Sequence, residues 1–281
     1  MAVKTWSTSF RKEECAAIPC TLCRSCSFIP HFNGYVRCSS CSLVQVNPQP
    51  LPINISERYN NGSGQEYLAY EKNNEAIFLR LGELALQDAG FFDLEADLLP
   101  AGPRVLDIGS AIGALPALLK NRGWAVQCVE ISVPQALYCR ERGLETSTLP
   151  LEDNHFLDQS FDAVIASHLI EHLNDPGSFV REVHRILKPN GRFYITTPNI
   201  DGFQAKIFGS RWRSAIFDHL YLFSAKTLRL ILEQSGFTVE RIKTWGGLAA
   251  GIAPVPVKKI FDAAVKPLGI GDVMIVRARC Q

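Results

Sequence analysis

The pattern with the clearest chemical meaning is a glycine loop that follows a short apolar run. Residues 105–113 read VLDIGSAIG, so Asp107, Gly109 and Gly113 are spaced as D-x-G-x-x-x-G. Glycines at these places let the backbone turn tightly and approach a ligand. A dinucleotide site instead has G-x-G-x-x-G, and a P-loop continues into Gly-Lys-Ser/Thr. Because Asp107 would repel a phosphate, the loop predicts a ligand that is neutral or cationic at this point.

A second carboxylate follows at the spacing expected of a ribose-binding residue. Glu130 ends the next apolar run, 21 residues after Gly109. A carboxylate there can accept hydrogen bonds from both ribose hydroxyls, and it would repel a 2′-phosphate. S-adenosylmethionine fits both carboxylates, because it has a ribose, an amino group and a sulfonium but no phosphate. We therefore predict it as the cofactor. The missing middle glycine disfavours the alternative, a nicotinamide-dependent oxidoreductase.

Short apolar strands alternate with helical segments from residue 104 onward. The pattern predicts strands at 104–108, 125–131, 161–167, 192–197, 238–245 and 271–279, and helices at 114–123, 134–143, 176–191 and 224–236. Such alternation indicates a mostly parallel sheet, whose ligands bind at the carboxyl ends of the strands. The glycine loop lies at such an end. Before it, an apolar periodicity over 76–86 predicts an amphipathic helix.

Five motifs in this order resemble the class I S-adenosylmethionine-dependent methyltransferases: LDIGSAIG, VEIS, SFDAVIASHLIEHLNDP, LKPNGRFYITTPN and FDHLYLFS. The resemblance covers about residues 100–281. It implies a Rossmann-like, doubly wound α/β fold with a mostly parallel seven-stranded sheet. It also implies a set of cofactor-binding residues: Asp107, Gly109, Ser110, Gly113, Glu130, Ile131, Leu151 and Ser167.

Methyl transfer requires the acceptor and the methyl group to be aligned, and it needs a base only if the acceptor must lose a proton. The candidate catalytic residues are His172, His219 and Glu171. If residues 167–174 begin a helix, His168 and His172 share one face. This segment also resembles the ubiquinone-pathway O-methyltransferases, in which the corresponding side chains are associated with a divalent metal; His168 stands where that family has a carboxylate. Residues 211–213, Arg-Trp-Arg, either clamp an acceptor or form a solvated loop.

Six of the nine cysteines crowd into the first 41 residues, which indicates metal ligands in a reducing compartment. Two C-x-x-C pairs, 14 residues apart, supply four thiolates for structural zinc: Cys20, Cys23, Cys38 and Cys41. A redox pair, or a pairing of Cys23 with Cys26, is the alternative. The segment CTLC…GYVRCSSCSLVQVNPQP resembles the zinc ribbon that precedes some methyltransferases, including sugar C-methyltransferases, although Ser42 replaces the usual glycine. The resemblance favours the first pairing and a sugar-nucleotide or natural-product acceptor.

Composition limits the partners. The 281 residues include 29 Lys and Arg and 28 Asp and Glu, a net charge of +1, which disfavours a nucleic-acid-binding surface over the whole molecule. Without an apolar run long enough for a membrane span or a signal core, we expect a cytoplasmic protein.

We expect a zinc ribbon over 1–48, a connecting helical region over 49–100 and a methyltransferase domain over 101–281. The predicted reaction is methyl transfer to an oxygen or carbon of a small molecule. RNA or protein methylation, with the ribbon binding the substrate, is the alternative.

Overall fold

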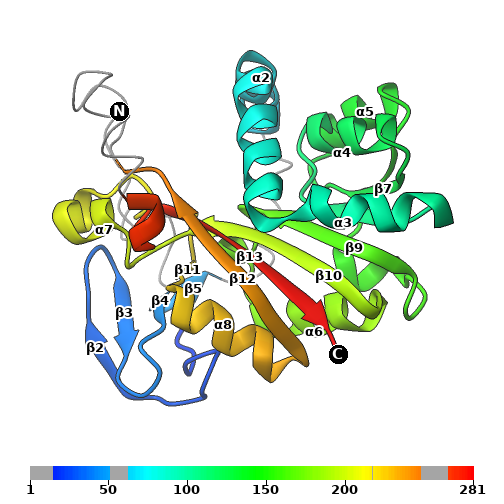
Figure 1. Cartoon of the computed structure of the whole chain (residues 1–281). Coiled ribbons are helices and arrows are strands. Elements are labelled where there is room, and N and C mark those ends of the chain that lie inside the picture. The colour runs from blue at the N-terminus through cyan, green and yellow to red at the C-terminus, as the bar shows by residue number, and fades with distance from the viewer. Residues whose placement is uncertain (1–14, 51–62, 217, 248–264) are drawn as a thin grey trace.

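The computed structural model describes residues 15–50, 63–216, 218–247 and 265–281. Its main sheet has seven strands in the order β12-β13-β10-β9-β6-β7-β8 (Figure 1). Their bounds are Arg104–Ile108 (β6), Ala125–Val129 (β7), Glu145–Ser147 (β8), Phe161–Ser167 (β9), Leu187–Pro198 (β10), Phe237–Trp245 (β12) and Val273–Cys280 (β13). Only β13 runs against its two neighbours within this sheet. The predicted fold class is therefore confirmed.

Helices cover both faces of the sheet, as a doubly wound fold requires (Figure 1). One face packs on α2 (Ser63–Ala89), α3 (Phe91–Leu98) and α4 (Ala114–Asn121), and α5 (Val133–Glu141) lies beside α2 and β8. The opposite face packs on α6 (Pro176–Ile186) and α8 (Ala225–Gln234). Neighbouring strand residues such as Val105 and Leu106 fall into different apolar clusters, because successive side chains point to opposite faces.

Local signals account for where the helices begin and end. Ser224 and Thr227 form a reciprocal capping box at the start of α8, at the predicted residue. The sequence predicts that the helix from Pro176 continues to residue 191, and this is wrong: α6 ends at Ile186 and the chain joins β10. Pro189 has no N–H for a helical hydrogen bond, and its ring clashes with the preceding turn, so a helix cannot pass through it.

The cysteine-rich segment is built into the larger fold. Its strands are β2 (Phe28–Pro30), β3 (Tyr35–Cys38) and β4 (Val44–Val46), and β4 pairs with β11 (Tyr221–Leu222) to complete a sheet in the order β11-β4-β3-β2. A separate pair joins β1 (Cys15–Ala16) to β5 (Gln49–Pro50). We call the described residues 15–50 the N-terminal module; in Figure 1 its blue strands lie below α7 (Phe203–Phe208). The module thus shares hydrogen bonds with residues far along the chain.

Residues 63–101 also pack against the main sheet. Leu86 of α2 and Phe91 of α3 lie in one apolar cluster with Val105 and Ile165. A short 3₁₀ turn, η3 (Leu99–Ala101), leads from α3 to the first strand. Of the predicted segments, residues 1–14 and 51–62 lie outside the described residues, and the three boundaries remain predictions. In the described part of the chain, no helix is both long and apolar enough to cross a membrane.

Candidate functional site

The glycine loop joins β6 to α4 at the carboxyl end of the sheet. Gly109 and Gly113 both have φ of 75°, and Ala111 between them has φ of 48°. The N–H of Gly109 donates to the backbone oxygen of Val129, which holds the loop against β7. A Cβ on Gly113 would lie 2.6 Å from Cδ1 of the buried Leu144. Glycine suits both this backbone angle and this close neighbour, so the loop can pass close to the segment that joins α5 to β8.

Two buried carboxylates from neighbouring strand ends flank this loop. Asp107 belongs to β6, and Glu130 follows β7 and accepts hydrogen bonds from the N–H groups of Ala111 and Ser132, both at 2.9 Å. Burial and the charge of Glu130 raise the pKa of Asp107 to about 7. Burial also raises the pKa of Glu130 to about 7, although the two N–H groups act in the opposite direction. Both carboxylates therefore favour a cationic or hydroxyl-bearing ligand.

The remaining predicted cofactor residues surround the same strand ends. Ser110 is buried in the loop, with its Oγ 3.8 Å from Sγ of Cys139, and Ile131 follows Glu130 and is half-buried. Leu151 is buried and opens η4 (Leu151–Asn154) beyond β8. Ser167 ends β9, the neighbour of β6. All eight residues thus lie at or just beyond the carboxyl ends of four adjacent strands.

A third buried carboxylate, Glu71, was missed from the sequence. It lies on α2, its pKa is raised by burial, and its charge raises that of Glu130 in turn. The apolar periodicity that predicted this helix begins at residue 76, so Glu71 fell outside the predicted helix. Its position on an N-terminal helix gives no spacing signal relative to the glycine loop.

A polar cluster, made of Glu171, His172 and His219, lies next to the loop, beyond β9 and β10. A Cβ on Gly109 would lie 3.6 Å from Cδ1 of Leu169, so the turn after β9 packs directly on the loop. Residues 167–174 do not form the predicted helix: only the 3₁₀ turn η5 (Ile170–His172) is present. His168 has φ of 52° and a side chain that is 49% exposed. Its Nδ1 lies 3.3 Å from Oε1 of Glu171.

Ligand atoms of Glu171, His172 and His219 lie within 4.8 Å of one another. Glu171 is fully buried and accepts a hydrogen bond from the Thr197 hydroxyl at 2.9 Å. Burial alone would raise the pKa of Glu171, but the bond from His168 and the surrounding imidazoles lower it to about 2. The cluster therefore contains an ionised carboxylate.

The two imidazoles of this cluster meet at 4.7 Å between ring centres. Nδ1 of His172 donates to the backbone oxygen of Asp218 at 2.9 Å, and Nδ1 of His219 donates to that of Ser214 at 2.8 Å. Burial, followed by the charge of His172, lowers the pKa of His219 to about 4. His219 is therefore neutral at pH 7 with its proton on Nδ1, which leaves Nε2 as an acceptor or a metal ligand.

Residues 211–213 are not arranged as an acceptor clamp. The Trp212 indole is buried and donates to the fully buried Asp272, and Arg213 Nε donates to the same carboxylate at 2.7 Å. Arg211 is exposed at the end of η6 (Gly209–Arg211). The Trp-Arg pair therefore ties this loop to the start of β13.

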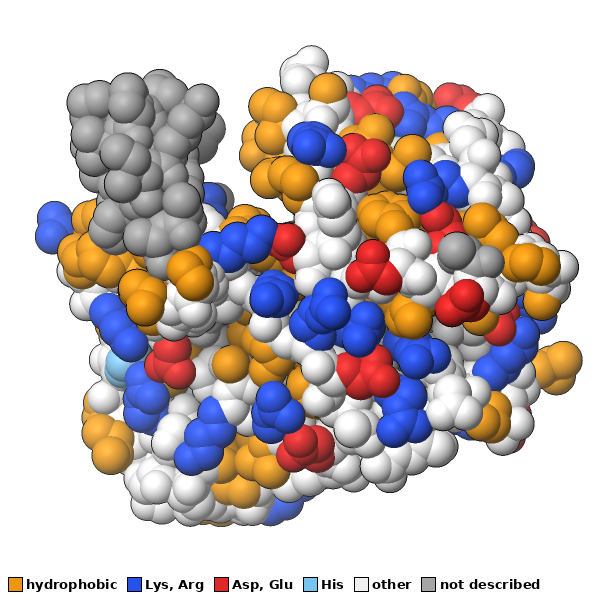
Figure 2. Space-filling view, in the orientation of Figure 1, with side chains coloured by type: hydrophobic (Ala, Val, Ile, Leu, Met, Phe, Trp, Pro, Cys, Tyr) orange, Lys and Arg blue, Asp and Glu red, His pale blue; other side chains and the backbone are white. Residues whose placement is uncertain are grey.

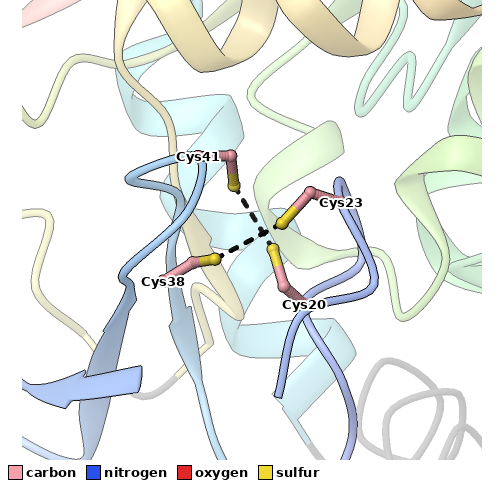
Figure 3. Close-up of side chains that lie close together, drawn as sticks. All are labelled: Cys20, Cys23, Cys38 and Cys41. Atoms are coloured by element: carbon pink, nitrogen blue, oxygen red, sulfur yellow. Dashed lines mark hydrogen bonds between the residues drawn. The ribbon is translucent and has the colours of Figure 1, made fainter. Parts of the chain in front are cut away.

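The four predicted zinc ligands converge on one point (Figure 3). Sγ–Sγ distances are 3.4 Å from Cys20 to Cys41 and from Cys23 to Cys38. Tetrahedral zinc with Zn–S bonds of about 2.3 Å has S–S edges of about 3.8 Å, so the thiols need move little to fit the ion. Cys26 is exposed and lies outside the group.

The cysteine cluster also has the electrostatics of a cation site. Burial raises the pKa of Cys20 to about 11 and that of Cys41 further, so these thiols become thiolates most readily beside a cation. Although burial acts in the same direction on Cys38, backbone N–H groups of Cys41 and Ser40 help lower its pKa to about 6. The donor set of four sulfurs fits zinc with no open position.

The central part of the chain is similar to known proteins. A sequence model described as a methyltransferase domain matches residues 81–242. A ubiquinone biosynthesis O-methyltransferase from Xanthomonas oryzae pv. oryzae is 32% identical over 106 residues, which are 35% of this chain and 44% of that protein. One from Pseudomonas aeruginosa is 29% identical over 134 residues, 45% and 57% of the two chains. The chain spans about half the length of these curated relatives.

Among solved structures, a SAM-dependent methyltransferase from Thermotoga maritima, described as a possible histamine N-methyltransferase, has a TM-score of 0.54 at 22% identity. It covers 81% of this chain and 99% of its own. The strand order and the strand-end glycine loop define the class I fold of S-adenosylmethionine-dependent methyltransferases. Because the domain match extends over more than half of the sequence, this chain belongs to the methyltransferase domain family. The N-terminal module lies outside the matched residues.

Proposed function

We propose that this chain transfers the methyl group of S-adenosylmethionine to an oxygen or carbon of a small-molecule acceptor. The observation that carries the proposal is the pair of buried carboxylates, Asp107 and Glu130, that flank the glycine loop, whose sequence is not a phosphate-binding motif. The ligand's ammonium and sulfonium charges would compensate this pair, and its ribose hydroxyls would donate to Glu130. Bound there, the cofactor supplies an electrophilic methyl group.

The residues of the polar cluster take different roles in this proposal. Glu171 is fully buried behind the imidazoles, so we propose that it holds them rather than touching the acceptor. His172 and His219 would contact the acceptor. With a pKa of about 4, His219 is a weak base, which suits accepting a hydrogen bond from an acceptor hydroxyl. The same three side chains could instead hold a divalent ion.

We further propose that Cys20, Cys23, Cys38 and Cys41 bind structural zinc, and that the domain limits are 1–48, 49–100 and 101–281. Support for the zinc site comes from the convergent thiols and from the absence of any other cysteine in the cluster among the described residues. Metal analysis of the purified protein tests this directly. One zinc per chain, lost in Cys38→Ser, is the expected result; a metal-free, folded protein would contradict it.

The surface supports a small molecule over RNA as the acceptor. Figure 2 shows Lys and Arg side chains across the middle of one face, where β12 and β13 lie, with acidic side chains among them. Arg192, Arg277 and Arg279 lie 3.6, 2.9 and 3.2 Å from the Glu240 carboxylate. Their charge is therefore partly neutralised within the protein. RNA binding would require these cations to be available for phosphates and would weaken steeply with salt.

The decisive experiment follows label from methyl-labelled S-adenosylmethionine into pooled metabolites fractionated by class, with RNA and protein fractions counted in parallel. We expect label in a sugar-nucleotide or natural-product fraction, and none with Asp107→Asn. Glu141→Gln, which removes an exposed carboxylate of α5, is the control and should retain activity. Label only in RNA or protein would favour the alternative, and no binding of S-adenosylhomocysteine would refute the proposal.

A further inference from the structure

The N-terminal module reaches the polar cluster through one side chain. Tyr35, the first residue of β3, is buried, and its hydroxyl lies 2.7 Å from the backbone oxygen of His219 and 2.9 Å from that of Ile216. These carbonyls belong to the loop that presents the His219 imidazole. The other end of β3 is Cys38, one of the four convergent thiols.

The loop itself has little regular structure to hold it. Between η6 and β11 the described backbone makes short turns, such as His219 N–H to the oxygen of Ile216 at 3.1 Å. β11 is only two residues long and pairs with β4 of the module. The N–H of Val46 donates to the oxygen of Leu220 at 2.8 Å. A strand this short forms only against an existing edge, and the module supplies that edge.

Through β11, which it pairs with, the module also supports the turn that carries Glu171 and His172. Leu220 N–H donates to the oxygen of Glu171 at 2.7 Å, and the Tyr221 hydroxyl donates to that of Asn174 at 2.9 Å. The same hydroxyl lies 2.8 Å from Thr21 Oγ1 of the module. Both imidazoles of the cluster are therefore held by backbone that is hydrogen-bonded to, or paired with, residues 15–50.

We propose that the N-terminal module braces the loop that presents His219, and that Tyr35 is a positioning residue that fixes His219. This inference rests on the proposed function. The glycine loop and Glu130 form none of these hydrogen bonds: theirs join them to each other and to residues of β7, β8 and α5. The module therefore governs the rate of methyl transfer and leaves cofactor affinity unchanged.

Tyr35→Phe tests the proposal in the full chain, because it removes the hydroxyl and keeps the buried ring. We expect unchanged metal content and an unchanged Kd for S-adenosylhomocysteine. The kcat should fall by up to about a hundredfold, the loss that a misplacement of about 1 Å can cause. In nitrogen-15 spectra, the His219 imidazole should shift from its single Nδ1–H tautomer towards a mixture of tautomers.

Asn33→Gly is the matched control. Asn33 Nδ2 also joins the module to the larger domain, through the oxygen of Ser210 at 2.8 Å, but it does not touch the His219 loop. Asn33 has φ of 52°, which glycine adopts freely, so the backbone is not strained by the change. We expect this variant to match the parent protein in kcat and in the His219 spectrum.

Two outcomes would overturn the inference: a folded Tyr35→Phe with parental kcat and His219 resonances, or an equal loss in Asn33→Gly. Should Tyr35→Phe fail to fold, Tyr221→Phe replaces it, with the same loss of kcat expected and a parental kcat refuting the proposal. If the parent protein methylates no acceptor, the proposed function fails, while the spectra of the variants still decide whether Tyr35 orders the His219 imidazole.

Discussion

Replacing Glu130 by glutamine removes one of two buried charges without changing the size of the side chain. In the parent protein this carboxylate accepts hydrogen bonds of 2.9 Å from the N–H groups of Ala111 and Ser132, and its pKa is about 7. Asp107 also has a pKa of about 7, because it is buried and close to Glu130. Both pKa values lie above the usual range of carboxyl groups, so cofactor binding should be coupled to the release of protons.

The magnitude follows from the fraction of each group that is ionised. At pH 6 a group with a pKa of about 7 is about nine-tenths protonated, so a ligand that requires its carboxylate form binds about tenfold more weakly than at pH 8. Two such groups together make the difference in affinity between pH 6 and pH 8 up to about a hundredfold. Glu130→Gln leaves only Asp107, whose pKa should fall once the charge of Glu130 is gone, so the pH dependence of its affinity should be less than about tenfold. At pH 8 its affinity should be lower by about 1.5–3 kcal/mol, the net value of a hydrogen bond to a charged group.

Stability of the cofactor-free protein should follow the opposite trend. A raised pKa means that the folded state binds the proton more tightly than the unfolded state does. The stabilisation from Asp107 and Glu130 is therefore complete below the unfolded pKa of about 4 and is lost as the pH rises through about 7. Thermal unfolding without ligand should show a smaller loss over this interval in Glu130→Gln.

Calorimetric titration with S-adenosylhomocysteine at pH 6, 7 and 8, in two buffers of different ionisation enthalpy, gives the affinity and counts the protons released. Glu141→Gln, on the exposed side of α5, should titrate like the parent. An affinity that does not change between pH 6 and pH 8 in the parent protein would refute the reasoning, because the two carboxylates would then not contact the ligand as ionised groups.

Three further predictions concern structure around the two sites. Gly113→Ala should lower the free energy of unfolding by about 2–4 kcal/mol, because it adds left-handed backbone strain and a clash with Leu144. The control Gly102→Ala has φ of 66° and open space around it, so it should lower the free energy of unfolding by only about 1–2 kcal/mol. Equal losses of the two variants in urea unfolding would exclude the clash. Asp272→Asn should lower the free energy of unfolding by about 1–3 kcal/mol, because it weakens the contacts to Trp212 and Arg213, and should leave the KM for acceptor unchanged; a raised KM would support the clamp. Chelation of zinc should lower the Tm of the full chain by several degrees, as expected for loss of a structural metal, while the Kd for S-adenosylhomocysteine stays the same; an unchanged Tm would argue against a structural ion.

The glycine loop and the carboxylates beside it could be located from the sequence because their signals are local. Asp107, Gly109 and Gly113 lie within one turn, and Glu130 follows at the end of the next strand. Parallel strands bring their carboxyl ends to one edge, so the spacing along the chain translates into proximity. The strands at 104–108 and 161–167 agree with the structure residue by residue. The short strand β8 was not placed, since three residues carry too little pattern.

The polar cluster depends on contacts that no local pattern carries. Its residues were named from the sequence, but Glu171 and His172 were considered as part of a helix over 167–174, whereas the chain turns at His168 and half-exposes that side chain. The His219 imidazole lies against His172 next to β11, and β11 pairs with β4, a strand far earlier in the sequence. Trp212 was predicted to lie in an acceptor clamp or a solvated loop, and no sequence pattern pointed to its partner, Asp272, because that residue lies sixty positions further on.

The same long-range contacts explain why the matched domain and the site have different limits. Residues 81–242 include both carboxylates of the glycine loop and all three members of the polar cluster, but not Tyr35, β4 or β13. The proposed cofactor-binding residues therefore lie within the matched region, while Tyr35, whose hydroxyl donates to the His219 backbone oxygen, lies before it. Under this proposal, a loop braced from outside the shared domain lets acceptor choice change without altering the glycine loop. Acceptor specificity should accordingly be sought in the module and in the 214–222 loop that it holds.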